Sequence, residues 1–162
     1  MNAWTNFTGL RRRALAVLAV GVVTASSATL AAAAPWQAQH FPLAALAEEP
    51  LRNGFVEVIH PDGPQVYAHH VYKLTGARSN ESYQVVISIW TSNVACAGGP
   101  AFVLPAAVVD TNPTGNGEAD VVFAPELLDA LGLRGLTIGG NVTLYRGGAP
   151  TYTTECRPIQ LD

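Results

Sequence analysis

The sequence predicts an all-β domain, an antiparallel β-sandwich of seven or eight strands with one short crossover helix and one disulfide. From Gly54 onward, short runs of β-branched and aromatic residues are separated by clusters of Gly, Pro and Asn, a spacing typical of a sandwich or barrel. The segment "APELLDALG" has instead the features of a helix, with Pro125 in its first turn and Gly132 as its stop. The chain also contains two cysteines, Cys96 and Cys156.

The individual strands follow from composition and pattern. "SYQVVISIW" is the strongest, and its apolar residues on both faces predict a central, well-covered position. "FVLPAAVV" is interrupted by Pro105, which predicts an edge strand or a bulge because proline has no amide to donate. A Pro-Asp-Gly-Pro cluster between the first two strands predicts a hairpin. The other predicted strands are, in order, "GFVEVIH", "QVYAHHVYKL", "EADVVF", "GNVTLYR", "PTYTTECR" and "PIQLD".

Residues 1–34 have the pattern of a secretory signal peptide. Three arginines, Arg11 to Arg13, precede the apolar "ALAVLAVGVV", and small residues follow up to Ala34, where we expect cleavage. "RRRAL" also fits a twin-arginine signal, so the export route stays open. The apolar run is shorter than the roughly 20 residues of a membrane span, so we expect no span after cleavage. The predicted location is extracellular, periplasmic or associated with the cell envelope.

Charge and composition exclude one class of partner. The chain has nine basic and twelve acidic residues, and loss of Arg11–Arg13 leaves six basic residues against the same twelve, a net charge of −6. Such a surface repels phosphate backbones, so we expect no nucleic-acid partner. The apolar content predicts a compact domain, because disordered chains combine low hydrophobicity with high charge.

The two cysteines are expected to form one disulfide, since an even pair in an exported domain most simply bonds. Closing a loop of 60 residues between Cys96 and Cys156 stabilises a chain by roughly 4 kcal/mol in the chain-entropy model. The alternative is a redox or metal-binding thiol pair. The spacing is not Cys-x-x-C and no histidine is adjacent, which favours the disulfide.

Domain organisation follows from the change in composition at Gly54. Residues 35–53 carry three prolines, and we interpret them as a linker or covering segment with one helical turn at "LAALAEE". Residues 54–162 form the predicted β-sandwich domain, about the usual size of a domain with one core.

One stretch resembles a known superfamily. "LTGARSNESYQVVI", with Leu74, Gly76, Asn80 and Tyr83, is similar to the turn and tyrosine that lead into a strand in fibronectin type III and related immunoglobulin-like domains. The resemblance implies an immunoglobulin-like sandwich. The leucine-to-tyrosine spacing is longer here and the proline that normally follows the leucine is absent. A fold resemblance of this kind implies no function.

The loop "DTNPTGNGEAD" allows two interpretations. Pro113 bends the chain, and we expect Asn116 and Gly117 to supply the positive φ angles of a tight hairpin. The alternative is a calcium site, because oxygen-bearing side chains alternate as they do at the start of an EF-hand loop. The residue at the twelfth position, Val121, is not the glutamate that an EF-hand requires. The alternative calcium ligands are Asp110, Asn112, Thr114, Glu118 and Asp120.

The predicted function is a non-catalytic binding or structural role outside the cytoplasm, with no cofactor. No G-x-S-x-G elbow occurs, and His69 and His70 are adjacent on one strand, so they point to opposite faces and do not share a metal ion. A calcium-stabilised module is the alternative and a secreted enzyme a distant one. Aromatic residues on strands mostly pack in the core or against neighbouring strands, whereas an exposed stripe of them would bind an extracellular protein or carbohydrate. The candidates for such a stripe are Tyr67, Tyr72, Trp90, Tyr145 and Tyr152.

Overall fold

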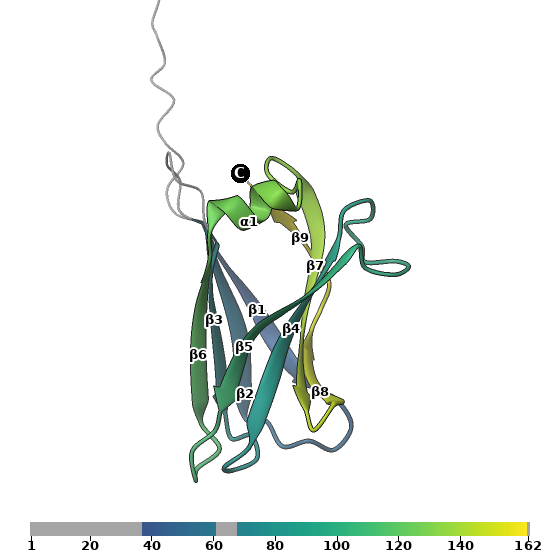
Figure 1. Cartoon of the computed structure of the whole chain (residues 1–162). Helices are drawn as coiled ribbons and strands as arrows, with labels where there is room; N and C mark the ends of the chain where they lie inside the picture. The colour runs from purple at the N-terminus through teal and green to yellow at the C-terminus, as the bar shows by residue number, and fades with distance from the viewer. Residues whose placement is uncertain (1–36, 61–67, 162) are drawn as a thin grey trace, which may run out of the picture. The chain divides into compact units, whose positions relative to one another are not determined.

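The computed structural model describes residues 37–60 and 68–161. Within these residues the chain is all-β, with one short helix (Figure 1). The elements are β1 (Gln37–Ala45), β2 (Asn53–His60), β3 (Ala68–Thr75), β4 (Ser82–Trp90), β5 (Phe102–Asp110), β6 (Gly117–Phe123), α1 (Pro125–Ala130), β7 (Thr137–Arg146), β8 (Ala149–Thr154) and β9 (Arg157–Gln160). The predicted signal peptide and the first hairpin turn lie outside the described residues.

The nine strands form one antiparallel sheet that curves nearly into a barrel. Its order is β5-β4-β7-β8-β1-β2-β3-β6, and β9 pairs with β7. The two end strands, β5 and β6, lie side by side near the loop that connects them and then diverge (Figure 1). The prediction of an all-β antiparallel domain with one short helix is confirmed, whereas the nine strands form one sheet and not the predicted sandwich of seven or eight.

Strand β1 corrects the prediction that residues 35–53 are a linker or covering segment. Gln37–Pro42 pair with β2, and Leu43–Ala45 pair with β8, so β1 joins the two halves of the sheet. The segment "LAALAEE" begins as strand, where the sequence indicated a helical turn. Pro42 made a strand improbable, since proline interrupts a ladder. It is tolerated because it lies at the point where β1 changes partner.

The core consists of the inward-facing residues of every other strand position. On β4 these are Tyr83, Val85, Ile87 and Ile89, all buried, whereas Val86 is only half-buried on the other face. Burying a side chain of this size stabilises a fold by roughly 1.5–3 kcal/mol. The alternation along β4 therefore fixes which face of the strand meets the core. β4 lies next to the end strand β5, so it is an interior strand of the sheet but not its centre.

The loop between β5 and β6 is a tight turn, but its strained residue is not the predicted one. Gly115 has φ of +74°, whereas Asn116 and Gly117 are not in the positive-φ region. Gly115 lies against the turn before β4, where the amide of Ala77 donates to the carbonyl oxygen of Gly115 at 3.0 Å. The prediction of positive φ at Asn116 and Gly117 is therefore wrong. Gly115, one position before Asn116, has the positive φ because this residue lies close to Ala77.

The loop between β1 and β2 is fastened to the sheet by polar contacts. The Tyr152 hydroxyl donates to the carbonyl oxygen of Pro50 at 2.7 Å. The Glu49 carboxylate accepts from Arg78 at 2.8 Å and from Arg146 at 2.6 Å. The hydrogen bond from Arg78, assisted by the charge of Arg146, lowers the pKa of Glu49, so this carboxylate stays ionised.

Candidate functional site: an apolar cavity beside an edge strand

Helix α1 covers the end of the sheet at which β5 and β6 have diverged (Figure 1). Pro125 opens it, Glu126 lies in the first turn near the positive end of the helix dipole, and Gly132 follows it with φ of +64°. This confirms the predicted helix and its stop. Leu128 of the helix and Leu133 just beyond it are buried, so the helix presents leucine side chains to the interior.

An apolar cavity of about 50 Å³ lies beneath α1. Its walls come from α1 with its following turn and from six strands, including both end strands through Leu104 of β5 and Phe123 of β6. The wall residues are mostly aliphatic, and Gly140 of β7 leaves space between them. A Cβ at Gly140 would lie 2.5 Å from Cδ1 of Ile159, another wall residue.

His70 is the polar side chain of this wall. Its Nδ1 lies 3.1 Å from the Tyr72 hydroxyl, and its ring meets the ring of Phe123 edge-on, with 5.0 Å between centroids. Burial raises the pKa of Tyr72, so its hydroxyl stays protonated. The predicted opposition of the two histidines is confirmed, since His70 is buried and His69 lies on the outer face.

The two end strands differ as edges. β5 contains Pro105, and its pairing with β4 shifts register between Val85 and Val86, which leaves Ala106 as a bulge. This confirms the predicted edge strand. β6 contains no proline, and its seven residues pair with β3 without interruption from Gly117 to Phe123. A proline and a bulge are features that protect an exposed edge from further pairing, so only β5 has this protection.

The outer face of β6 is acidic and exposed. Glu118 lies 2.9 Å from Nζ of Lys73, and Asp120 lies 3.4 Å from Nε2 of His69. Their side chains are nevertheless 55% and 70% exposed, and Val122 is 56% exposed. Exposed ion pairs of this kind add little stability, so both carboxylates are accessible to a second partner.

The predicted aromatic binding stripe is not formed by the described residues. Tyr72 and Tyr152 are fully buried, so they pack in the core as strand aromatics mostly do and cannot belong to a binding stripe. Trp90 and Tyr145 are partly exposed but pair with Gly139 and Gln84, at opposite ends of the β4–β7 ladder. Tyr67 lies outside the described residues. Strand alternation alone could not predict which aromatic residues face inward, because the face depends on the sheet that each strand joins.

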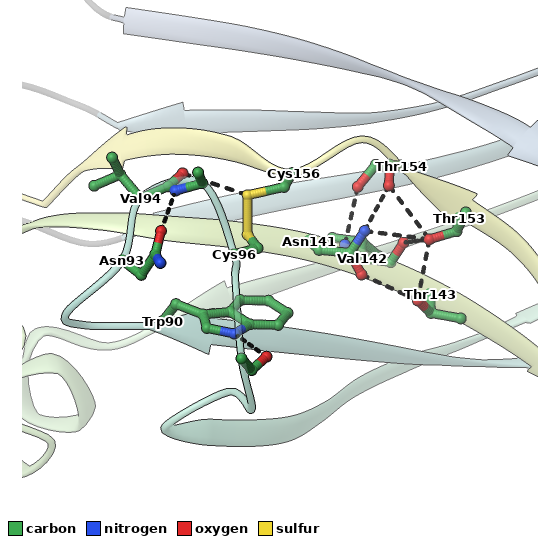
Figure 2. Close-up of a disulfide and its surroundings, with 12 residues drawn as sticks. Trp90, Asn93, Val94, Cys96, Asn141, Val142, Thr143, Thr153, Thr154 and Cys156 are labelled. Atoms are coloured by element: carbon green, nitrogen blue, oxygen red, sulfur yellow. Dashed lines mark hydrogen bonds between the residues drawn. A yellow bond between two sulfur atoms is a disulfide. The ribbon is translucent and has the colours of Figure 1, made fainter.

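The predicted disulfide is confirmed between Cys96 and Cys156 (Figure 2). It ties the loop after β4 to the connection between β8 and β9, and Trp90 Nε1 donates to the carbonyl oxygen of Gly98 in the same loop. Gly139 of β7 allows the loop after β4 to approach the sheet closely, since a Cβ there would lie 2.7 Å from the carbonyl oxygen of Asn93. The disulfide indicates an oxidising compartment.

Beside the disulfide, polar side chains on β7 and β8 form hydrogen bonds with one another. Asn141 donates to the Thr153 hydroxyl at 3.2 Å and to the carbonyl oxygen of Thr154 at 2.5 Å (Figure 2). Thr143 donates to Asn141 Oδ1 at 3.1 Å. Because these groups bond to one another, this surface holds no converging set of side chains aimed at a ligand.

The alternative calcium ligands do not converge. Asn112 Oδ1 accepts from the amides of Thr114 and Asn116 and from the Thr114 hydroxyl, so it serves the turn itself. The Asp110 carboxylate accepts from Ser82, whereas Glu118 and Asp120 face β3. Within residues 37–60 and 68–161, no group of three or more His, Cys, Asp or Glu side chains is placed to hold a metal ion.

We therefore expect calcium to leave the thermal midpoint of the domain unchanged. The reason is that the Asn112 side-chain oxygen already closes the turn through three hydrogen bonds. The measurement is a thermal melt in calcium and in chelator. A midpoint that rises with calcium in the native chain and does not respond in Asp110→Ala would show that the loop binds the ion.

Comparison of the chain with family models, curated proteins and solved structures finds no match. The immunoglobulin-like resemblance therefore stays a prediction. Tyr83, which suggested it, is buried, and among the described residues its hydroxyl has no hydrogen-bond partner. In the part of the chain that the structure describes, no helix is long and apolar enough to cross a membrane.

Proposed function

We propose that the chain is a non-catalytic binding domain that acts outside the cytoplasm and holds an apolar group of a protein partner in the cavity beneath α1. The observation that carries this proposal is an apolar cavity whose wall includes residues of both end strands, which are not paired with each other.

The size of the cavity favours a protein partner over a small molecule. Pockets that enclose a drug-sized ligand measure roughly 300–1,000 Å³, and an apolar cavity of about 150 Å³ holds benzene. A cavity of about 50 Å³ accepts the end of one aliphatic side chain. Its lining also disfavours carbohydrate, because buried sugar hydroxyls need hydrogen-bond partners and His70 is the polar side chain of the wall.

The disulfide supports the proposed location. It indicates an oxidising compartment, and the sequence pattern of residues 1–34 predicts a secretory signal. Catalysis is disfavoured by the composition of the cavity, since its aliphatic wall offers neither a nucleophile beside a base nor a pair of carboxylates.

The proposal is tested by filling the cavity. Ala68 lies in its wall, on β3, and is buried, so Ala68→Val should occupy the space with two added carbons. 1-Propanol is titrated into methyl-labelled protein, and the shifts of Leu104, Leu128 and Ile159 are followed by NMR. We expect saturable shifts in the native chain and their loss in Ala68→Val.

The matched control is Ala44→Val, which makes the same change at an exposed strand position. It should bind 1-propanol like the native chain. Equal shifts in the native chain and in Ala68→Val, or shifts scattered over the surface, would contradict the proposal that the cavity is the binding site.

A further inference from the structure

We propose that the partner binds as an extended segment that adds to the sheet as a strand beside β6, next to α1. Its basic side chains lie over the outer face of β6, and one of its apolar side chains enters the cavity. This inference rests on the proposed function and names the form and the charge of the partner.

The choice of β6 follows from the contrast between the two edges. β5 is interrupted by Pro105 and by the bulge at Ala106, whereas β6 continues its pairing with β3 over all seven residues. A regular edge strand presents a row of unpaired amides and carbonyl oxygens, which is the template that an added strand requires. β5 and β6 diverge toward α1 (Figure 1), and β6 is an end strand of the sheet that pairs only with β3, so its outer backbone edge is unpaired in this half.

The position of the cavity is the reason to expect an apolar side chain on the partner. Phe123 of β6 and Leu104 of β5 both contribute to the cavity wall. Side chains of a strand alternate between the two faces of a sheet. A strand beside β6 therefore directs every second side chain to the inner face of the sheet and the others outward, and the inward side chain beside Phe123 is the one that reaches the cavity.

The outer face of β6 selects the charge of the partner. Asp120, the central residue of β6, has a side chain that is 70% exposed there, so a lysine or arginine on the added strand would form a cross-strand pair with it. A second copy of this chain is disfavoured by the same residue. If two β6 strands paired antiparallel about their central residue, Asp120 would lie opposite Asp120, and like charges in that position destabilise a pair.

The probe for this inference is a synthetic peptide of about seven residues, capped at both ends, in which lysine and valine alternate. Its control has the same side chains but an N-methyl group on every amide, so it cannot donate to an edge strand. We expect the first peptide to bind and the second not to bind. Amide hydrogen exchange should slow in β6 and stay unchanged at Phe102–Leu104 of β5.

The charge requirement is tested with two variants that make the same change of charge. Asp120→Lys should weaken peptide binding by about fivefold, because an attractive cross-strand pair becomes a repulsive one. Glu57→Lys, on the interior strand β2 of the sheet, should bind like the native chain. Equal weakening in both variants would show that only net charge matters and would overturn the inference.

The other outcomes are equally decisive. Binding of the N-methylated peptide with the same affinity, or protection of β5 in place of β6, would overturn strand addition at β6. If no peptide binds while 1-propanol still saturates the cavity, strand addition is wrong and the proposed function stands. If 1-propanol also fails to enter the cavity, the proposed function itself is wrong.

Discussion

Replacing Gly115 with alanine is expected to destabilise the domain by about 4 kcal/mol, a large fraction of the stability of a small domain. Gly115 has φ of +74°, and a Cβ there would lie 2.0 Å from the carbonyl oxygen of Ala77. The two turns would have to separate, and the hydrogen bond from the Ala77 amide to the Gly115 carbonyl oxygen at 3.0 Å would be lost. Urea unfolding of the native chain and the variant measures the difference.

The matched control is Gly135→Ala. Gly135 has the same φ of +74°, but a Cβ there would meet nothing within 4 Å. The free energy of unfolding of this variant should fall by only about 1 kcal/mol, the cost of placing alanine at positive φ. The difference between the two variants therefore measures the close approach to Ala77. Equal losses in both would show that the loop moves away without cost and that the contact does not hold the turn.

Removing the disulfide is expected to cost about 3–4 kcal/mol of unfolding free energy. The bond joins residues 60 apart in sequence, and without it the unfolded chain gains conformational freedom. The loss should be measured by urea unfolding of the double variant Cys96→Ala and Cys156→Ala. Amide exchange in the native state should also quicken in residues 91–100 and in β9, because the disulfide anchors both segments to the sheet.

Reduction of the native chain provides the control, because it breaks the same bond without substituting any residue. The reduced chain and the double variant should have the same midpoint in urea. A loss of about 1 kcal/mol or less in both would contradict the prediction, and would show that the unfolded chain is already restricted without the bond. A loss in the double variant alone would assign the effect to packing at the substituted positions.

The local pattern of the chain determined most of its elements. Alternation along "SYQVVISIW" predicts β4, and Pro105 predicts the interrupted edge β5, because side-chain period and backbone donors are properties of the segment itself. Pro125 and Gly132 set the ends of α1 for the same reason. The disulfide followed from counting, since a single pair of cysteines in an oxidising compartment has one way to bond.

Only the tertiary structure decided which strand pairs with which and what each face covers. β1 escaped prediction because Pro42 lies where the strand exchanges β2 for β8, and a change of partner leaves no trace in the local pattern. The local sequences around Tyr72 and Tyr152 do not distinguish them from surface aromatic residues, yet both are buried. Gly115 carries the positive φ because Ala77, 38 positions earlier, approaches it.

The cavity beneath α1 is also a feature that only the tertiary structure decides. Its wall is assembled from six strands and α1, and each contributes one or two ordinary apolar residues that sequence alone assigns to a core. The exposed edge of β6 is likewise a consequence of sheet order, because "EADVVF" would read the same at the centre of a sheet. Periodicity is fixed by neighbours in the chain, whereas cavities and free edges arise where distant segments fail to meet.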